Sequence, residues 1–174
     1  AVFGTNVEGM LRVTQAVLPL FRLRRAGVVV NVSSVAGRTT FPFQSLYHGS
    51  KWAVEGLTEG MAHELRPLGI RVKLVEPGMV RTPLYDRTCA QPDRTVAREY
   101  RTDFAAWRRY LLDNIAAGEG PETSATAIYR AATDGRNRLR YAAGADARLA
   151  FVLRAVLPGW AGSALVRRLP GVRG

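Results

Sequence analysis

VVVNVSS at residues 28–34 and IRVKLVEP at residues 70–77 are the two stretches of sequence that decide the fold. Both are rich in β-branched and other apolar residues, which is the pattern of a strand buried on both faces of a parallel sheet. Between them, residues 45–67 carry apolar side chains at helical spacing. A strand, a helical crossover and a second strand predict parallel strands in a layered α/β fold.

Further helices and one short strand are predicted around this unit. Apolar residues recur at helical spacing over residues 4–24 and over residues 93–117. Another helix is predicted to begin near Pro121, because proline is favoured at the first helical position. Residues 140–142 form a predicted edge strand, and the apolar segment 147–169 that follows is interrupted by a Pro-Gly pair.

The predicted helix at 45–67 carries small residues in register beside its apolar stripe. These residues are spaced by four, three and four positions: Gly49, Ala53, Gly56 and Gly60. Glycine lowers helix stability by up to about 1 kcal/mol relative to alanine, so glycines at this spacing need a packing reason. We therefore predict that another backbone packs closely against this face.

The 174 residues suffice for one domain with a hydrophobic core. We divide them into a folded unit at 1–144 and a basic amphipathic C-terminal tail at 145–174. Cys89 is the only cysteine in the sequence, which excludes an intrachain disulfide and is typical of a reducing, cytoplasmic setting. No apolar run reaches the length of a membrane-spanning helix.

The formal net charge is +11, and much of it lies near the C-terminus. Residues 136–174 contain eight arginines and a single acid, Asp146. Such a segment fits a solvated basic face, a nucleic-acid partner or an anionic membrane surface. No nucleic-acid-binding motif is present, so we favour a solvated face with, at most, weak peripheral contact with a membrane.

Tyr47 and Lys51 stand four residues apart in the predicted helix, so their side chains leave the same face. A free tyrosine has a pKa of about 10, which is too high for ready proton exchange near neutral pH. A nearby ammonium favours the phenolate and lowers that pKa. The pair is therefore a candidate general acid and base, although this spacing alone is common on surface helices.

Other residues extend this pair to a longer pattern. Asn6 precedes a strand that ends at Ser34, Tyr47 follows thirteen residues later in YHGSK, and the second strand runs into a Pro-Gly turn. This order resembles the Asn-Ser-Tyr-Lys set and the Pro-Gly turn of the short-chain dehydrogenase/reductase family. The resemblance covers most of residues 1–144. It implies a Rossmann-like, doubly wound parallel sheet, NAD or NADP as cofactor, and interconversion of an alcohol and a ketone or aldehyde.

The resemblance also implies a role for each matching residue. Tyr47 would protonate the substrate carbonyl oxygen in reduction and deprotonate the alcohol in oxidation. Lys51 would lower the pKa of Tyr47 and hydrogen-bond the nicotinamide ribose, and the Ser34 hydroxyl would contact the substrate oxygen. Asn6 would hold a water molecule that links Lys51 to solvent. These four residues form the predicted catalytic set.

The family's Pro-Gly turn bends the chain after its strand, so that residues just beyond it meet the nicotinamide carboxamide. The predicted cofactor-binding set therefore comprises Tyr47, Lys51, Pro77, Gly78, Val80 and Thr82. The hydride chemistry itself belongs to the cofactor.

Several of these residues also have a purely structural explanation. Ser34 fits a turn cap, and Asn6 fits a helix N-cap. His48 and His63 lie fifteen residues apart on one predicted helix with no ligand set around them, so no metal site is expected. We interpret His48 as part of the wall of the site.

The family's other cofactor motifs have no counterpart in the sequence. A dinucleotide site needs a first strand and a glycine-rich turn, at which the pyrophosphate meets a helix N-terminus. The resemblance therefore implies an N-terminally truncated sheet, with those motifs upstream of residue 1 and an exposed apolar strand edge at 28–33. We expect the 174-residue chain to bind cofactor poorly and to turn over little.

Aromatic residues predict either an apolar substrate pocket with a lid or helix packing on the core. They are Phe41, Phe43, Tyr85, Tyr100, Phe104 and Trp107. The tail resembles that of family members acting on retinoids, steroids or other lipid-like molecules, which favours a hydrophobic substrate. Family members also pair the helices equivalent to 4–24 and 45–67 across subunits, so a homodimer or homotetramer is expected.

Two other functions stay open. A catalytically idle relative would serve as a binding or regulatory module, or the chain would be an inactive fragment of an enzyme. The intact Ser34-Tyr47-Lys51 set argues against idleness. A sugar-nucleotide epimerase or dehydratase shares the Tyr-x-x-x-Lys spacing, but it usually carries a larger C-terminal domain than this sequence has room for.

Overall fold

The computed structural model describes residues 1–83 and 96–172. Its centre is a three-stranded sheet in the order β1 (Gly27–Val32), β2 (Ile70–Pro77) and β3 (Arg140–Ala143). Both strand pairs are parallel, and Gly27 of β1 lies opposite Ile70 of β2. The predicted strands and their parallel pairing are confirmed. Within the described residues, β1 pairs with β2 alone.

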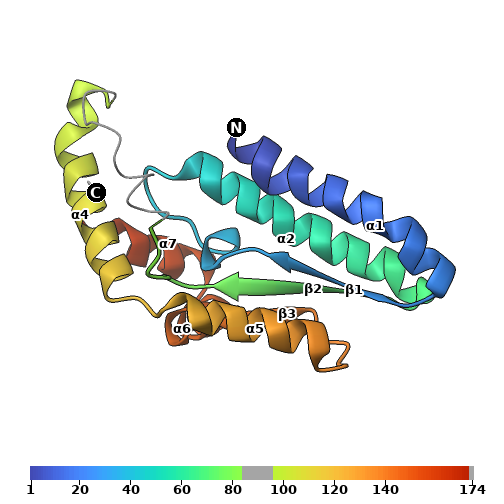
Figure 1. Cartoon of the computed structure of the whole chain (residues 1–174). Coiled ribbons are helices and arrows are strands. Elements are labelled where there is room, and N and C mark those ends of the chain that lie inside the picture. Colours follow the sequence, from blue (N-terminus) through green and yellow to red (C-terminus); the bar gives the residue numbers. More distant parts are fainter. Residues whose placement is uncertain (84–95, 173–174) are drawn as a thin grey trace.

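Helices cover both faces of this sheet (Figure 1). The helices labelled in Figure 1 are α1 (Met10–Arg24), α2 (Ser45–Leu65), α4 (Arg101–Ala116), α5 (Pro121–Thr133), α6 (Ala145–Val156) and α7 (Gly159–Arg167). Helices α1 and α2 pack on one face of the sheet, and α5 packs on the other. No helix in the described part of the chain is long and apolar enough to cross a membrane.

The predicted helices differ from the observed ones mainly at their ends. The helix predicted at 4–24 starts as a π-helical turn, Gly4–Gly9, before α1. The helix predicted at 93–117 is observed from a 3-10 turn at Arg98–Tyr100 onward. The apolar tail forms two helices, because proline drives the preceding residue, Leu157, into the extended conformation that ends α6.

Strand β2 is the buried centre of the molecule. Successive side chains of a strand point to opposite faces of its sheet. Val72 therefore packs with Val29 and Leu65 on the face of α1 and α2. Val75 packs with Ala131 of α5 on the opposite face. Burial on both faces explains why the apolar pattern of this strand is nearly continuous.

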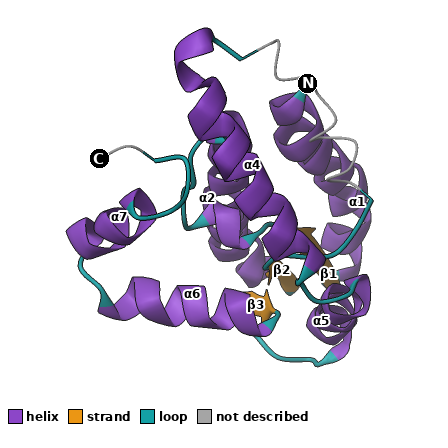
Figure 2. Ribbon diagram, turned by 90° about the vertical axis from the view of Figure 1, so that its left-hand side faces the viewer, coloured by secondary structure: helices purple, strands orange, loops and turns teal. Residues whose placement is uncertain are grey.

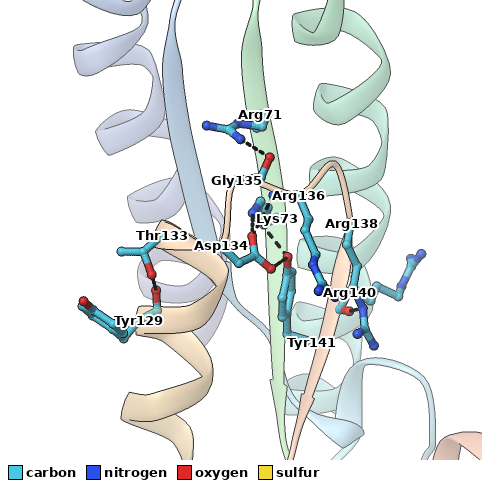
Figure 3. Close-up of polar contacts among 10 residues, drawn as sticks. All are labelled: Arg71, Lys73, Tyr129, Thr133, Asp134, Gly135, Arg136, Arg138, Arg140 and Tyr141. Atoms are coloured by element: carbon cyan, nitrogen blue, oxygen red, sulfur yellow. Dashed lines mark hydrogen bonds and ion pairs between the residues drawn. The ribbon is translucent and has the colours of Figure 1, made fainter.

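One lysine interrupts the apolar pattern of β2, and its ammonium is fully partnered (Figure 3). Lys73 is 1% exposed, and its Nζ donates to Asp134 Oδ1 at 2.7 Å and to the Tyr141 hydroxyl at 3.3 Å. The Tyr141 hydroxyl donates to Asp134 Oδ2 at 2.7 Å. These three residues, called the Lys73 cluster below, tie β2 to β3 and to the end of α5. Hydrogen bonds from Lys73 and Tyr141 hold the pKa of Asp134 well below its usual range.

The prediction of a close backbone neighbour along the small-residue face of α2 is wrong within the described chain. A Cβ atom added at Gly56 or Gly60 would meet nothing within 4 Å. At Gly49 it would meet the ring of Phe3 at 3.4 Å. The glycines leave most of this helix face open.

Candidate active site

The carboxyl ends of β1 and β2 place Ser34 beside the Pro-Gly turn. Ser33 extends the pairing of β1, since its backbone N–H donates to the Val75 carbonyl at 2.8 Å. Ser34 then caps a 3-10 turn, accepting at 3.1 Å from the backbone N–H of Ala36. Its hydroxyl also donates to the Pro77 carbonyl at 3.5 Å. Ser34 thus acts as a turn cap and stands at the predicted site.

Tyr47 and Lys51 lie in the first turns of α2 and face the end of β1. Lys51 Nζ donates to the Val32 carbonyl at 3.0 Å. The same nitrogen lies 5.9 Å from the centroid of the Tyr47 ring. The structure therefore brings Ser34, Tyr47 and Lys51 together from two separate elements, as the motif order implied.

Burial shifts the pKa values of both members of this pair. Burial raises the pKa of Tyr47, and the Ser34 hydroxyl opposes that shift. Burial also lowers the pKa of Lys51, opposed by the negative charge of Glu55. The Lys51 ammonium is directed at the Val32 carbonyl, and its role in lowering the pKa of Tyr47 stays a prediction. The phenol is held in its neutral, proton-donating form.

Asn6 joins the π-helical turn at the N-terminus to α2. Its side-chain amide donates to Ser50 Oγ at 3.0 Å, and Ser50 Oγ donates to the Tyr47 carbonyl at 2.7 Å. Asn6 is therefore linked to the backbone of Tyr47 through the Ser50 hydroxyl. Asn6 and Lys51 both line an open groove of about 520 Å³ along β1.

The Pro-Gly turn is fixed by contacts with the start of α6. The backbone N–H of Gly78 donates to the Ala143 carbonyl at 3.1 Å, and that of Met79 donates to Asp146 Oδ2 at 2.6 Å. A Cβ atom at position 78 would overlap the Asp146 carboxylate, so a larger residue there would displace the side chain that fixes the turn. Val80 beyond the turn pairs with Glu119, and Thr82 is half-buried.

His48 is a structural side chain. It is 2% exposed, and its Nδ1 lies 3.0 Å from the Ala36 carbonyl. Its Nε2 accepts from the backbone N–H of Phe41 at 3.0 Å. These two contacts fit a neutral imidazole, and burial lowers the pKa of the ring. His48 therefore fixes the loop that joins β1 to α2.

The aromatic residues predicted as a pocket or as core form two groups, and core packing is observed for the group around Trp107. Trp107 of α4 is 2% exposed and packs with Phe41, which is core packing. Phe43 instead meets Tyr100 and Phe104 edge-on, with ring centroids at 6.5 and 5.5 Å. Tyr85 and Cys89 lie outside the described residues.

Sequence reasoning missed a group of buried charges directly behind the site. Glu55 follows Lys51 by one helical turn, and Glu76 immediately precedes the Pro-Gly turn. Arg140 Nε lies 3.3 Å from Glu55 Oε2 and 3.7 Å from Glu76 Oε1. Arg38 lies 3.6 Å from Glu76 Oε1. These four residues are called the Glu76 cluster below.

The carboxylates of the Glu76 cluster are incompletely satisfied. Glu55 Oε1 and Glu76 Oε1 have no hydrogen-bond partner in the part of the chain that the structure describes. Burial raises the pKa of both carboxyls, and burial together with the neighbouring Glu55 raises that of Glu76 to about 7. One sequence feature could have indicated this cluster: Glu76 is an acid at the end of a mainly apolar strand.

A family model described as short chain dehydrogenase matches residues 1–93, which is more than half of the chain. The chain belongs to the short-chain dehydrogenase family. An uncharacterized oxidoreductase of Schizosaccharomyces pombe is 34% identical over 156 residues, covering 82% of this chain and 59% of the relative. The 17-beta-hydroxysteroid dehydrogenase type 1 of Homo sapiens is 32% identical over 145 residues, covering 81% and 44%.

A solved short-chain dehydrogenase/reductase from Burkholderia phymatum, in complex with NAD, has the same arrangement of elements. It matches with a TM-score of 0.69 and 30% identity over 86% of this chain and 54% of that one. The predicted Rossmann-like α/β fold is therefore confirmed for this short-chain dehydrogenase. The chain spans about half the length of the curated relatives that it matches.

Proposed function

We propose that these residues form the catalytic and nicotinamide side of an NAD(P)-dependent oxidoreductase that interconverts an alcohol and a ketone or aldehyde. The observation that carries the proposal is the meeting of Ser34, Tyr47 and Lys51 at the carboxyl end of β1. Ligands of open parallel sheets bind at this end of the strands. Family membership supports the same activity.

The residues present fit a nicotinamide cofactor. Lys51 has three N–H donors, and one of them reaches the Val32 carbonyl while the side chain lines the open groove along β1. Gly78 leaves the turn beyond β2 without a side chain. The residues that would hold the cofactor are Tyr47, Lys51, Pro77, Gly78, Val80 and Thr82. When bound, the cofactor supplies or accepts the hydride.

The chain's own residues would transfer the proton to the substrate oxygen. The neutral Tyr47 phenol donates a proton to a carbonyl oxygen during reduction, and burial favours this form before the reaction. The Ser34 hydroxyl would orient the same oxygen, since it lies at the neighbouring strand end. Once the phenolate forms, the Lys51 ammonium would stabilise it. Asn6, in this proposal, holds the water through which Lys51 regains a proton.

The substrate class that we propose is hydrophobic. Phe43, Tyr100 and Phe104 form an aromatic group in the loop before α2 and at the start of α4. Aromatic side chains supply much of the apolar lining of small-molecule sites. The likeness to the human 17-beta-hydroxysteroid dehydrogenase supports a ketosteroid or a similar lipid-like ketone as a first substrate to test.

A homodimer is the assembly that we infer for the intact enzyme. The open face of α2 at Gly56 and Gly60 leaves room for the backbone of a second copy. Analytical ultracentrifugation of Gly56→Leu should then show a monomer where the unmodified protein is a dimer. A dimer that survives this substitution would place the interface elsewhere.

Turnover by the intact enzyme that contains these residues, with a reduced nicotinamide cofactor and a panel of hydrophobic ketones, tests the proposed activity. Tyr47→Phe should lower kcat by about 10²–10⁴-fold, because the proton donor is removed while the ring stays. Ser34→Ala should lower it by about 10²-fold. Tyr129→Phe is the matched control, since Tyr129 is 72% exposed on α5. Cofactor binding without turnover of any substrate would instead favour the idle binding module.

A further inference from the structure

A cavity of about 640 Å³ lies between α6, α7 and the loop that follows β1. Figure 2 shows α6 and α7 on the side of the molecule away from α1. Trp52 of α2 and Tyr110 of α4 complete the wall. None of the four candidate catalytic residues lines this cavity. Its volume falls within the range of roughly 300–1,000 Å³ that is typical of small-molecule sites.

The lining of the cavity combines an apolar interior with arginines. The apolar part comes mainly from α6 and α7, including Leu153, Leu157 and Val166. Three arginines line it as well, and no aspartate or glutamate among the described residues does. An apolar cavity with cations and no acid is complementary to a molecule with an apolar body and a negative end.

The three arginines are not equivalent. Arg38 is already paired with Glu76 at 3.6 Å and stacks over the Phe151 ring at 4.6 Å. Arg154 lies over the Trp52 ring at 5.7 Å, and Arg167 is exposed at the end of α7. Within residues 1–83 and 96–172, neither Arg154 nor Arg167 forms an ion pair with a carboxylate. Both guanidinium groups are therefore available to an anion.

The glycines of α7 keep the cavity open. Gly159 and Gly162 both line it, and a Cβ atom at either position would meet nothing within 4 Å of the described chain. Glycine inside a helix costs about 1 kcal/mol relative to alanine. Since no steric contact requires glycine here, a larger side chain at Gly162 would occupy the cavity without a backbone clash.

We propose that this cavity binds an amphiphilic anion: an alkyl chain lies in the apolar interior, and its carboxylate is held by Arg154 and Arg167. Guanidinium groups bind carboxylates through paired, charge-assisted hydrogen bonds, which gives the negative end a fixed position. The apolar walls supply the affinity, because chain burial removes apolar surface from water. This site does not depend on the proposed dehydrogenase activity.

Calorimetric titration with dodecanoate below its micellar concentration tests the site on the purified chain. The unmodified protein should bind one molecule, and Arg154→Ala/Arg167→Ala should weaken binding by about tenfold or more. Arg168→Ala is the matched control, because Arg168 is exposed, adjacent in sequence and not part of the lining. Dodecyltrimethylammonium has the same chain with a positive end and should not bind.

Gly162→Leu separates binding in the cavity from binding on the surface. Its side chain should fill the cavity and abolish dodecanoate binding, while the melting temperature stays the same or rises. Dodecanoate binding that is equal in all three variants, or absent from the unmodified protein, would overturn the proposal. Sedimentation with anionic vesicles without binding of monomeric dodecanoate would assign the arginines to a membrane surface and would overturn it as well.

Discussion

The Lys73 cluster and the Glu76 cluster lie on opposite faces of β2, and they differ in how completely their polar atoms are satisfied. In the Lys73 cluster, an ammonium, a carboxylate and a phenol hydroxyl all bond one another. In the Glu76 cluster, two carboxylates share two guanidinium groups, and one oxygen of each carboxylate has no hydrogen-bond partner among the described residues.

The position of each cluster explains this difference. The Lys73 cluster ties together β2, β3 and α5 away from the candidate site, where a complete set of contacts favours stability. The Glu76 cluster directly precedes the Pro-Gly turn at the carboxyl end of the sheet, where ligands of this fold class bind. Buried carboxylates with incomplete hydrogen bonding resist ionisation. Removal of the acid should therefore lower the stability of the fold in the Lys73 cluster, and it should relieve a cost at neutral pH in the Glu76 cluster.

Asp134→Ala should give the largest effect on stability. Removal of this carboxylate leaves the Lys73 ammonium buried with only the Tyr141 hydroxyl as a partner among the described residues. An unpaired charge at Lys73 should lower the free energy of unfolding by about 3 kcal/mol or more. Urea denaturation measures this loss, and Asp113→Ala, at an exposed position on α4, is the control. An equal loss in both variants would contradict the comparison.

Glu76→Gln should change the pH dependence of stability. The pKa of Glu76 is raised to about 7 in the folded chain, so between its ordinary value of 4.5 and pH 7 the folded state binds more protons than the unfolded state. Stability therefore falls as pH rises through this window. Ionisation of Glu76 in the folded state lowers the free energy of unfolding by up to about 3 kcal/mol. Glutamine does not ionise, so the variant does not lose this stability.

Melting temperatures of Glu76→Gln and the unmodified chain from pH 4 to pH 8 measure this effect. The variant should lose less stability across the window, so that its relative advantage grows with pH. Parallel curves for the two proteins would show that Glu76 ionises normally in the folded state.

Glu59→Gln should have the smallest effect. Glu59 also pairs with Arg140, at 2.9 Å, but its side chain is 47% exposed. Exposed ion pairs contribute little because water and salt screen them, so the loss should stay within about 0.5 kcal/mol. Urea denaturation at low and high salt compares this pair with the buried one. A loss as large as that of Asp134→Ala would show that burial does not explain why the two ion pairs differ in their contribution to stability.

Sequence alone predicted the sheet and the order of the site residues because both depend on local patterns. The β-branched runs at 28–34 and 70–77 fixed two parallel strands, and Tyr47 and Lys51 share a helix face by spacing alone. Ser34 was placed by the resemblance to the short-chain dehydrogenase/reductase family, whose serine has this spacing to the tyrosine. These features need no knowledge of distant contacts.

The charge clusters could not be predicted because their partners are distant in sequence. Lys73 and Glu76 stood out within an apolar strand, but Asp134 and Arg140 are brought to them only by the fold. The direction of the Lys51 side chain could not be predicted for a related reason. The direction of the Lys51 ammonium depends on the Val32 carbonyl, which belongs to another element.

Isotope transfer tests the central functional claim most directly. The intact enzyme that contains these residues is mixed with a hydrophobic ketone and a reduced nicotinamide cofactor that carries deuterium at its transferable position, and the product alcohol is examined by mass spectrometry. We expect deuterium on the carbinol carbon with the unmodified protein and with Tyr129→Phe, and almost none with Tyr47→Phe. Equal transfer by Tyr47→Phe, or no transfer by the unmodified protein under cofactor saturation, would contradict the assignment of Tyr47 as the proton donor of a dehydrogenase.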